Sequence, residues 1–348
     1  MQFAVFCKPV VTIYDTCQKT KMTEAGLQST ISDEGLYGMV CQVLDTSKEN
    51  LAESPAGWVR VMTHYGYVGW VCAEDLVLWN EEDLKEWQKK SEEGYLALVD
   101  TFCADIMSVP KVQGHCYISL VGGAVVEIVG NASEAAGWTR VRLLDGQEGY
   151  VRTQHLCPKR FTEDLLWQDA EPVLGRMAVA SANSRTAAGG QEGFELQSVL
   201  NHWFDGSENA FREKLVSEAM KYMGVQYRWG GKSFRGIDCS GLVSISYMRC
   251  GILIYRDASI VDGWPIQRLA IEDLKAAEAL DHLKKGDALY FPGHIAMYIG
   301  DGKYIHSTGR IGSGGVVINS LRPEDPDFRQ DLLDCLYAAG GVRLQEDF

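Results

Sequence analysis

Short runs of alternating apolar and polar residues dominate the first 157 positions of the chain. The run Trp58-Val59-Arg60-Val61 is followed by a glycine turn and then by Gly69-Trp70-Val71. A period of two places alternate side chains on opposite faces of a strand, and two such runs around a turn predict a β-hairpin. We therefore expect this half of the chain to be built from short strands joined by turns.

The same pattern returns 80 residues further along, where the segment 137–156 aligns with 57–76 without a gap. Eight of the twenty positions are identical: Gly57/Gly137, Trp58/Trp138, Arg60/Arg140, Val61/Val141, Gly66/Gly146, Gly69/Gly149, Val71/Val151 and Leu76/Leu156. This degree of self-similarity indicates two copies of one module. We predict small barrels over residues 1–78 and 95–157, joined over 79–94 by an exposed, acidic, helical connector.

Helical periodicity begins after residue 206 and precedes a series of strands. Apolar residues recur at helical spacing in Glu208 to Met223 and again after Asp238, and a further helix is expected from about Ile266 to Leu280. Strands are predicted at 288–291, on both arms of a hairpin through 294–307, and at 316–318 and 341–344. Helices followed by an antiparallel sheet predict an α+β domain over 207–348.

The segment 158–206 between these regions predicts a linker. It contains a short helix at Phe161 to Trp167 and an Ala/Ser/Gly-rich loop at 176–193.

Composition narrows the range of partners and compartments. A net charge of −14 argues against nucleic acid or an anionic membrane as the main partner. Met1 to Pro9 lacks the features of a signal peptide. The ten cysteines include no Cys-x-x-Cys pair, and several lie within strand-like runs, as free thiols in a reducing compartment do. We expect a cytoplasmic protein if Met1 is the native start, and an exterior one if the sequence is truncated.

Cys239 is the strongest candidate for chemistry. Asp238 is a good helix N-cap, which puts Cys239 in the first turn, where free N–H groups and the helix dipole stabilise a thiolate. The alternative is a buried cysteine that packs as a small hydrophobe. We expect a reactive thiol.

Two histidines lie on the two arms of the predicted hairpin. A two-residue turn would point His294 and His306 to opposite faces, because each one-residue shift in register exchanges the faces. A three-residue loop, Gly300-Asp301-Gly302, would pair Ala296 with His306 and bring both rings to one face. We predict the three-residue loop, with Gly302 in a left-handed conformation, and a nucleophile, base and orienting group.

Four motifs in order give the last 140 or so residues a resemblance to the NlpC-type, papain-like cell-wall endopeptidases. The motifs are Tyr227-x-Trp229-Gly230-Gly231, Asp238-Cys239-Ser240-Gly241, His294 and His306. The resemblance implies that Cys239 is the nucleophile, His294 the general base and His306 the orienting residue, while Tyr227 helps to hold the oxyanion. It implies no metal or cofactor. The first half resembles bacterial SH3-like barrels, and we expect a monomer.

The pairing of two SH3-like barrels with this domain resembles a subgroup that cleaves the γ-D-glutamyl-L-diamino acid bond of murein tripeptides or tetrapeptides with a free L-Ala. That resemblance assigns ammonium binding to Asp238 and Ser240, with N-capping as the alternative for Asp238. Other candidate substrate-binding residues are Tyr117, Asp257 and Ser259, although Ala258 stands where related chains carry serine. An acid from the first barrel is also expected, among Glu74, Asp75, Glu81, Glu82 and Asp83.

Three alternatives remain open. The chain could be a non-catalytic protein that binds the cell wall. It could be a different enzyme, namely an amidase, an acyltransferase or a lytic endopeptidase that acts on polymeric murein. Cys239, His294 and His306 could instead form a metal site.

Overall fold

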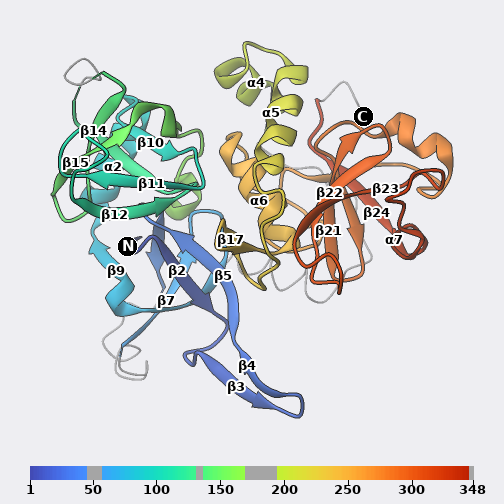
Figure 1. Ribbon diagram of the computed structural model, residues 1–348, viewed down its shortest axis with the longest axis horizontal. Coiled ribbons are helices and arrows are strands. Elements are labelled where there is room, and N and C mark those ends of the chain that lie inside the picture. Colours follow the sequence, from blue (N-terminus) through green and yellow to red (C-terminus); the bar gives the residue numbers. More distant parts are fainter. Residues whose placement is uncertain (45–56, 131–135, 169–193, 345–348) are drawn as a thin grey trace. The chain divides into compact units, whose positions relative to one another are not determined.

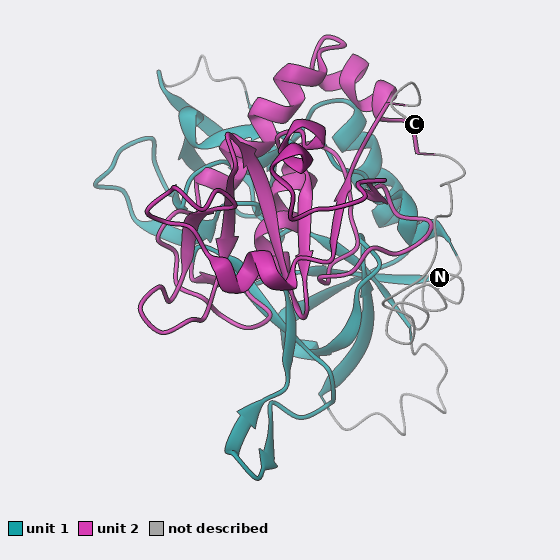
Figure 2. Ribbon diagram, turned by 90° about the vertical axis from the view of Figure 1, so that its right-hand side faces the viewer, with its two compact units in different colours: residues 1–170, 232–234 teal, residues 171–231, 235–348 magenta. Residues whose placement is uncertain are grey.

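The chain divides into two compact units in the computed structural model, which describes residues 1–44, 57–130, 136–168 and 194–344 (Figures 1 and 2). Unit 1 comprises residues 1–170 and 232–234, and unit 2 comprises residues 171–231 and 235–348. Within the described ranges, no helix is both long and apolar enough to span a membrane.

Unit 1 contains two seven-stranded antiparallel sheets with equivalent strand orders. The first runs β5 (Ile31–Leu36), β2 (Val10–Tyr14), β8 (Val68–Cys72), β7 (Trp58–Thr63), β6 (Val40–Val43), β1 (Gln2–Phe6), β9 (Leu76–Trp79). The second runs β12 (Cys116–Val121), β11 (Cys103–Met107), β15 (Glu148–Arg152), β14 (Trp138–Arg142), β13 (Val125–Ile128), β10 (Leu96–Val99), β16 (Leu156–Pro158). The repeat is thereby confirmed as two SH3-like modules.

The glycine and tryptophan residues shared by the two copies of the repeat lie in equivalent hairpins. β7 pairs with β8 from Trp58–Cys72 to Met62–Val68, and β14 pairs with β15 from Trp138–Arg152 to Arg142–Glu148. Each hairpin is followed by a 3₁₀ turn, η1 (Ala73–Asp75) or η3 (Thr153–His155). A separate two-stranded arm, β3 (Thr20–Thr23) with β4 (Gly26–Ser29), extends from the first module (Figure 1).

The connector between the modules is a capped helix, α2 (Glu81–Glu92). The Asn80 side chain accepts from the backbone N–H groups of Glu82 and Asp83, while Asp83 accepts from the Asn80 N–H, which forms a capping box. The predicted helix is confirmed; most of its residues are exposed or partly exposed, as expected, while Leu84 and Trp87 form a buried face.

Residues 232–234 pack with unit 1 although they lie within the second half of the sequence. The ammonium group of Lys232 is 2.9 Å from Asp33 Oδ2, and the Lys232 backbone N–H donates to Glu34. Both side chains of the Lys232–Asp33 ion pair are almost fully buried.

Unit 2 is an α+β domain, as predicted, with a six-stranded antiparallel sheet. Its order is β19 (Gln267–Arg268), β24 (Ala338–Gly341), β20 (Ala288–Phe291), β21 (His294–Gly300), β22 (Lys303–Ser307), β23 (Val316–Ser320). The helices are α4 (Leu196–Trp203), α5 (Glu208–Met220), α6 (Cys239–Arg249), α7 (Gln330–Cys335) and the 3₁₀ turn η5 (Ala277–His282). Every residue of α6 is buried, and this helix packs on α5, β21 and β22.

Several local predictions differ from the structure. The helix expected from Ile266 to Leu280 is wrong. Its first part is β19, held to the sheet where the Leu269 N–H donates to Ala339, and its end is η5. Leu269, Ile271, Leu274 and Leu280 still pack against the sheet, so their spacing reflects a covering segment rather than a helix.

Three other predicted element boundaries also differ from those in the structure. The last strand lies at Ala338–Gly341 rather than 341–344, α4 occupies part of the predicted linker, and only a 3₁₀ turn, η4 (Asp164–Trp167), forms within Phe161 to Trp167. Two strands of two residues each, β17 (Lys232–Ser233) and β18 (Gly236–Ile237), also form. The predicted loop at 176–193 lies outside the described residues.

Candidate active site

Cys239 is the first residue of α6, as predicted. Asp238 has extended backbone angles and accepts from the Gly241 N–H at 2.5 Å, which caps the helix. Cys239 is only 7% exposed. The Cys239 thiol is therefore buried at the N-terminus of α6, on the side of the helix that packs on the sheet.

The β21–β22 hairpin brings both histidines to one face by a different route from the one predicted. The three-residue loop is wrong, because Gly300 pairs with Lys303 across a two-residue turn, Asp301–Gly302, in which both residues have positive φ. A bulge between Tyr298 and Gly300 then shifts the register, so that Tyr298 pairs with Tyr304. The bulge supplies the odd residue, and the shared face is confirmed.

The two imidazoles are joined by a hydrogen bond. His294 Nε2 lies 2.7 Å from His306 Nδ1, and His306 Nε2 lies 2.9 Å from Asn319 Oδ1 on β23. His306 is 1% exposed, so both of its ring nitrogens are satisfied by protein groups rather than by water. Asn319 was not anticipated from the sequence.

Burial sets the protonation states of the site. It raises the pKa of Cys239 to about 11, helped by the neighbouring Asp238 carboxylate and opposed by the backbone N–H groups of Ile295 and Ser240 and by Arg256. Burial also lowers the pKa of His294 to about 3 and that of His306 to about 4. These shifts favour a neutral thiol and neutral imidazoles in the resting site, contrary to the thiolate expected from the helix start.

Tyr227 lies beside the thiol, as predicted. Burial raises the pKa of its phenol, and the Cys239 and Asp238 groups raise it further, so the hydroxyl is a neutral donor at any pH of interest. A Cβ on Gly309 would contact the Tyr227 ring at 3.3 Å, which shows how closely the backbone covers that face of the ring.

Asp238 is held by Arg256, a residue that the sequence analysis did not single out. Arg256 Nη1 and Nη2 lie 3.1 Å from Asp238 Oδ1 and Oδ2, respectively. Nη1 also donates to Ser240 Oγ at 2.6 Å, and the Gly230 N–H donates to Asp238 Oδ2 at 2.9 Å. The positive group that a buried carboxylate requires is thus already supplied within unit 2.

The remaining predicted binding residues are distributed over both units. In unit 2, the Ser259 N–H donates to the Asp257 carbonyl next to Arg256. In unit 1, Tyr117 packs against the core of the second module, Glu81 pairs with the N-terminus and Asp83 belongs to the capping box. Glu74 and Asp75 lie in η1, and Glu82 is in the first turn of α2. Ammonium binding by any of them stays a prediction.

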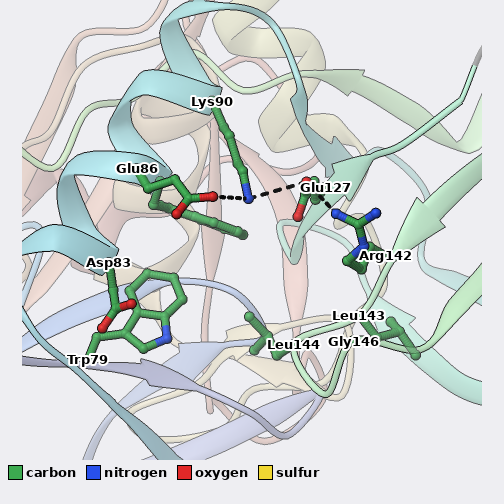
Figure 3. Close-up of a pocket in the computed structure, with 10 residues that line it drawn as sticks. Trp79, Asp83, Glu86, Lys90, Glu127, Arg142, Leu143, Leu144 and Gly146 are labelled. Carbon is green, nitrogen blue, oxygen red and sulfur yellow. Dashed lines mark hydrogen bonds and ion pairs between the residues drawn. The ribbon is translucent and has the colours of Figure 1, made fainter.

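Unit 1 also contains a pocket of about 200 Å³ beside α2 (Figure 3). Its charged groups form a chain in which Lys90 lies 2.9 Å from Glu86 and 3.3 Å from Glu127, while Glu127 lies 3.1 Å from Arg142. Because these charged groups are paired with one another, we interpret them as stabilising the module. They differ in this from the thiol and imidazoles of unit 2.

A buried helix-opening cysteine, a base from the neighbouring strand and a third group that orients the base define a papain-like cysteine hydrolase. The sequence model of the NlpC/P60 family matches residues 224–325, which include Cys239, His294 and His306. The chain is 32% identical over 320 residues to dipeptidyl-peptidase 6 of Lysinibacillus sphaericus, a match covering 92% of this chain and 94% of that protein. The chain belongs to the NlpC/P60 family of cysteine peptidases.

Two further comparisons agree with this assignment. The γ-D-glutamyl-L-lysine dipeptidyl-peptidase of Bacillus cereus is 36% identical over 103 residues, covering 27% of this chain and 28% of that protein. The crystal structure of an NlpC/P60 family protein from Bacillus cereus superposes with a TM-score of 0.62 at 18% identity, covering 98% of this chain and 99% of that one. This last likeness shows that the fold is shared.

Proposed function

We propose that the protein hydrolyses the γ-D-glutamyl-L-diamino acid bond of free murein peptides and releases L-Ala-D-Glu. The observation that carries the proposal is the buried Cys239 thiol, which receives the backbone N–H of Ile295, the residue next to His294 of the hydrogen-bonded His294–His306 pair. The near-full-length similarity to a dipeptidyl-peptidase supports peptide cleavage, and the similarity to a γ-D-glutamyl-L-lysine dipeptidyl-peptidase supports the choice of bond.

The proposed reaction is acyl transfer through Cys239. As the sulfur attacks the γ-glutamyl carbonyl carbon, its proton moves to His294, and the carbonyl π electrons move to oxygen. The Cys239 N–H, which has no acceptor among the described contacts, and the Tyr227 hydroxyl serve as donors to that oxyanion. His294 then protonates the leaving amine of the diamino acid, the C–N bond breaks, and a thioester remains. Water, deprotonated by His294, then adds to the thioester carbonyl, the C–S bond breaks, and the proton on His294 returns to the Cys239 sulfur.

Recognition of a free L-Ala amine is the finer part of the proposal. Because Arg256 already pairs with Asp238, a substrate ammonium would share this carboxylate with the guanidinium. Ser240 Oγ, which accepts from Arg256 and lies 3.3 Å from Asp238 Oδ1, belongs to the same cluster. The requirement for a free amine is therefore tested separately from the cleavage.

A metal site built from Cys239, His294 and His306 is disfavoured by the hydrogen bonds of His306. One of its ring nitrogens contacts His294 and the other contacts Asn319, so neither ring nitrogen is available to a metal ion without breaking a buried contact. We propose a cytoplasmic location, which is supported by cysteines such as Cys41, Cys72 and Cys239 that form no disulfide.

The test is mass spectrometry of three substrates after incubation with the full chain: L-Ala-γ-D-Glu-L-Lys, its N-acetyl derivative and polymeric murein. Of these three, we expect cleavage of L-Ala-γ-D-Glu-L-Lys alone. The corresponding diaminopimelate tripeptide is incubated in parallel. Cleavage of the acetylated peptide would overturn the amine requirement, and cleavage of polymer would overturn the recycling role. Cys239→Ala should abolish every product.

A further inference from the structure

We propose that Asn319 is a positioning residue of the active site, whose amide fixes the tautomer of His306 and so makes His294 a proton acceptor toward Cys239. Sheet register brings the two side chains together. His306 pairs with Val317, and Asn319 lies two residues further along β23, so the side chains are diagonal neighbours on one face. Asn319 Oδ1 is 2.9 Å from His306 Nε2.

The orientation of the Asn319 amide follows from its second contact. Its Nδ2 donates to the Asp327 carbonyl oxygen at 2.8 Å, and a carbonyl can only accept. The same carbonyl accepts from the Ser320 N–H at 3.1 Å. A flipped amide would place two oxygens in contact, so Oδ1 faces His306.

The position of Asp327 is fixed from a second side. Lys303 of β22 lies 2.6 Å from Asp327 Oδ1 and 2.8 Å from Asp325 Oδ2, which ties this loop to the strand that carries His306. Asn319 is therefore held between a backbone carbonyl and an imidazole, rather than free to turn.

The orientation of the Asn319 amide determines the tautomer of His306, and the tautomer of His306 determines that of His294. Because Asn319 Oδ1 can only accept, His306 carries its proton on Nε2, and its Nδ1 has a lone pair. That lone pair accepts from His294 Nε2–H across 2.7 Å. His294 is left with one ring nitrogen, Nδ1, to accept the thiol proton. Without Asn319, the His306 proton could move to Nδ1, which would reverse the chain and turn His294 Nδ1 into a donor.

The neighbouring ionisable groups do not impose this order. They are the Cys239 thiol of α6 with the Asp238–Arg256 pair behind it, the Tyr304 phenol of β22, and Arg329 and Asp331 at the start of α7. Arg329 lowers the pKa of both imidazoles, Asp331 raises that of His306 only, and neither side chain is hydrogen-bonded to a ring nitrogen among the described contacts. Among the residues that the structure describes, Asn319 is the one hydrogen-bonded to His306 Nε2.

The substitution test compares Asn319→Leu with Asn319→Asp, and Asn201→Leu, at an exposed position of α4, is the matched control. Asn319→Leu should lower kcat roughly 10- to 100-fold with little change in KM, since a buried donor loses its acceptor but no substrate contact changes. Asn319→Asp keeps an acceptor but adds a negative charge, which favours the His306 imidazolium. It should shift the acid limb of the kcat/KM profile upward by about one pH unit. Asn201→Leu should match the wild type.

A second measurement is independent of the substrate, since the kinetic test rests on the proposed function. Two-bond ¹H–¹⁵N correlation of the imidazoles in the wild-type chain should show His306 protonated on Nε2, and Asn319→Leu should lose that single state. A wild-type His306 protonated on Nδ1 would overturn the proposal even if Asn319→Leu failed to fold. Reduced activity with an unchanged tautomer in Asn319→Leu, or an unshifted acid limb in Asn319→Asp, would also overturn it.

Discussion

Replacement of Arg256 by methionine tests how the nucleophile segment is held. The guanidinium and the Asp238 carboxylate are joined by two contacts of 3.1 Å, and the Arg256 and Asp238 side chains are 1% and 10% exposed. Removal of one partner of a buried pair leaves the other charge without compensation, which typically costs about 3–5 kcal/mol. We expect Arg256→Met to destabilise unit 2 by about that amount and to raise the pKa of Cys239 further, because Arg256 lowers it.

The effect can be separated from lost packing by a double-mutant cycle with Asp238→Asn, which keeps an oxygen that can cap α6. The double variant should recover about 2 kcal/mol or more of the Arg256→Met loss, since no unpaired carboxylate remains. Hydrogen exchange of the α6 amides, followed by mass spectrometry across a urea series, reports the opening free energy of this helix.

Arg310→Met is the matched control. It breaks an ion pair with Asp331 in which both side chains are more than half exposed, and it should change stability by less than about 1 kcal/mol. The reasoning would be refuted if Arg256→Met were no more destabilising than Arg310→Met, or if the Arg256 and Asp238 substitutions were simply additive.

Three further predictions concern the thiol, the helix start and acid stability. The alkylation rate of Cys239, followed by peptide mass spectrometry, should rise about tenfold per pH unit from about pH 6 to 10, because burial raises its pKa to about 11; a plateau near neutrality would instead show a preformed thiolate. Gly241→Ala should abolish peptidase activity in a product assay, because its Cβ would collide with the Gly231 carbonyl that holds the Asp238 N–H, and wild-type turnover would contradict this. Burial raises the pKa of Glu218, but Arg249, Lys214 and Lys221 outweigh it and together bring the pKa from 4.5 down to about 2. About 3 kcal/mol of stability, present above pH 4.5, should therefore be lost as the pH falls toward 2. Glu218→Gln should flatten that part of a stability–pH curve, and an unchanged slope would exclude the effect.

Features set by neighbouring residues could be predicted from the sequence. The hairpins at Trp58 and Trp138 follow from alternation around glycine turns, and the N-cap at Asp238 follows from the local chemistry of a helix start. The shared face of His294 and His306 was also predicted, although the odd residue proved to be a bulge at 298–300 instead of a longer turn. A bulge and a longer loop change the register equally, so the sequence pattern does not separate them.

Features that depend on distant packing were not predicted. Arg256 lies in a loop, and only the folded chain brings it to Asp238. Asn319 belongs to a strand whose register against β22 is set by the sheet. The segment from Ile266 to Leu280 has helical spacing, but strand pairing with β24 competes for its first residues. The pKa of Cys239 was expected to fall because the helix start was visible in the sequence and the burial was not.

The most direct test of the central claim is to trap the acyl-enzyme. The full chain is mixed with L-Ala-γ-D-Glu-L-Lys, quenched in acid within the first turnover and digested, and the peptide containing Cys239 is analysed by mass spectrometry. We predict an Ala-Glu dipeptidyl thioester on Cys239, which is absent from Cys239→Ala and disappears as L-Ala-D-Glu is released. Turnover of the tripeptide by Cys239→Ala, or an acyl group on another residue, would contradict the account.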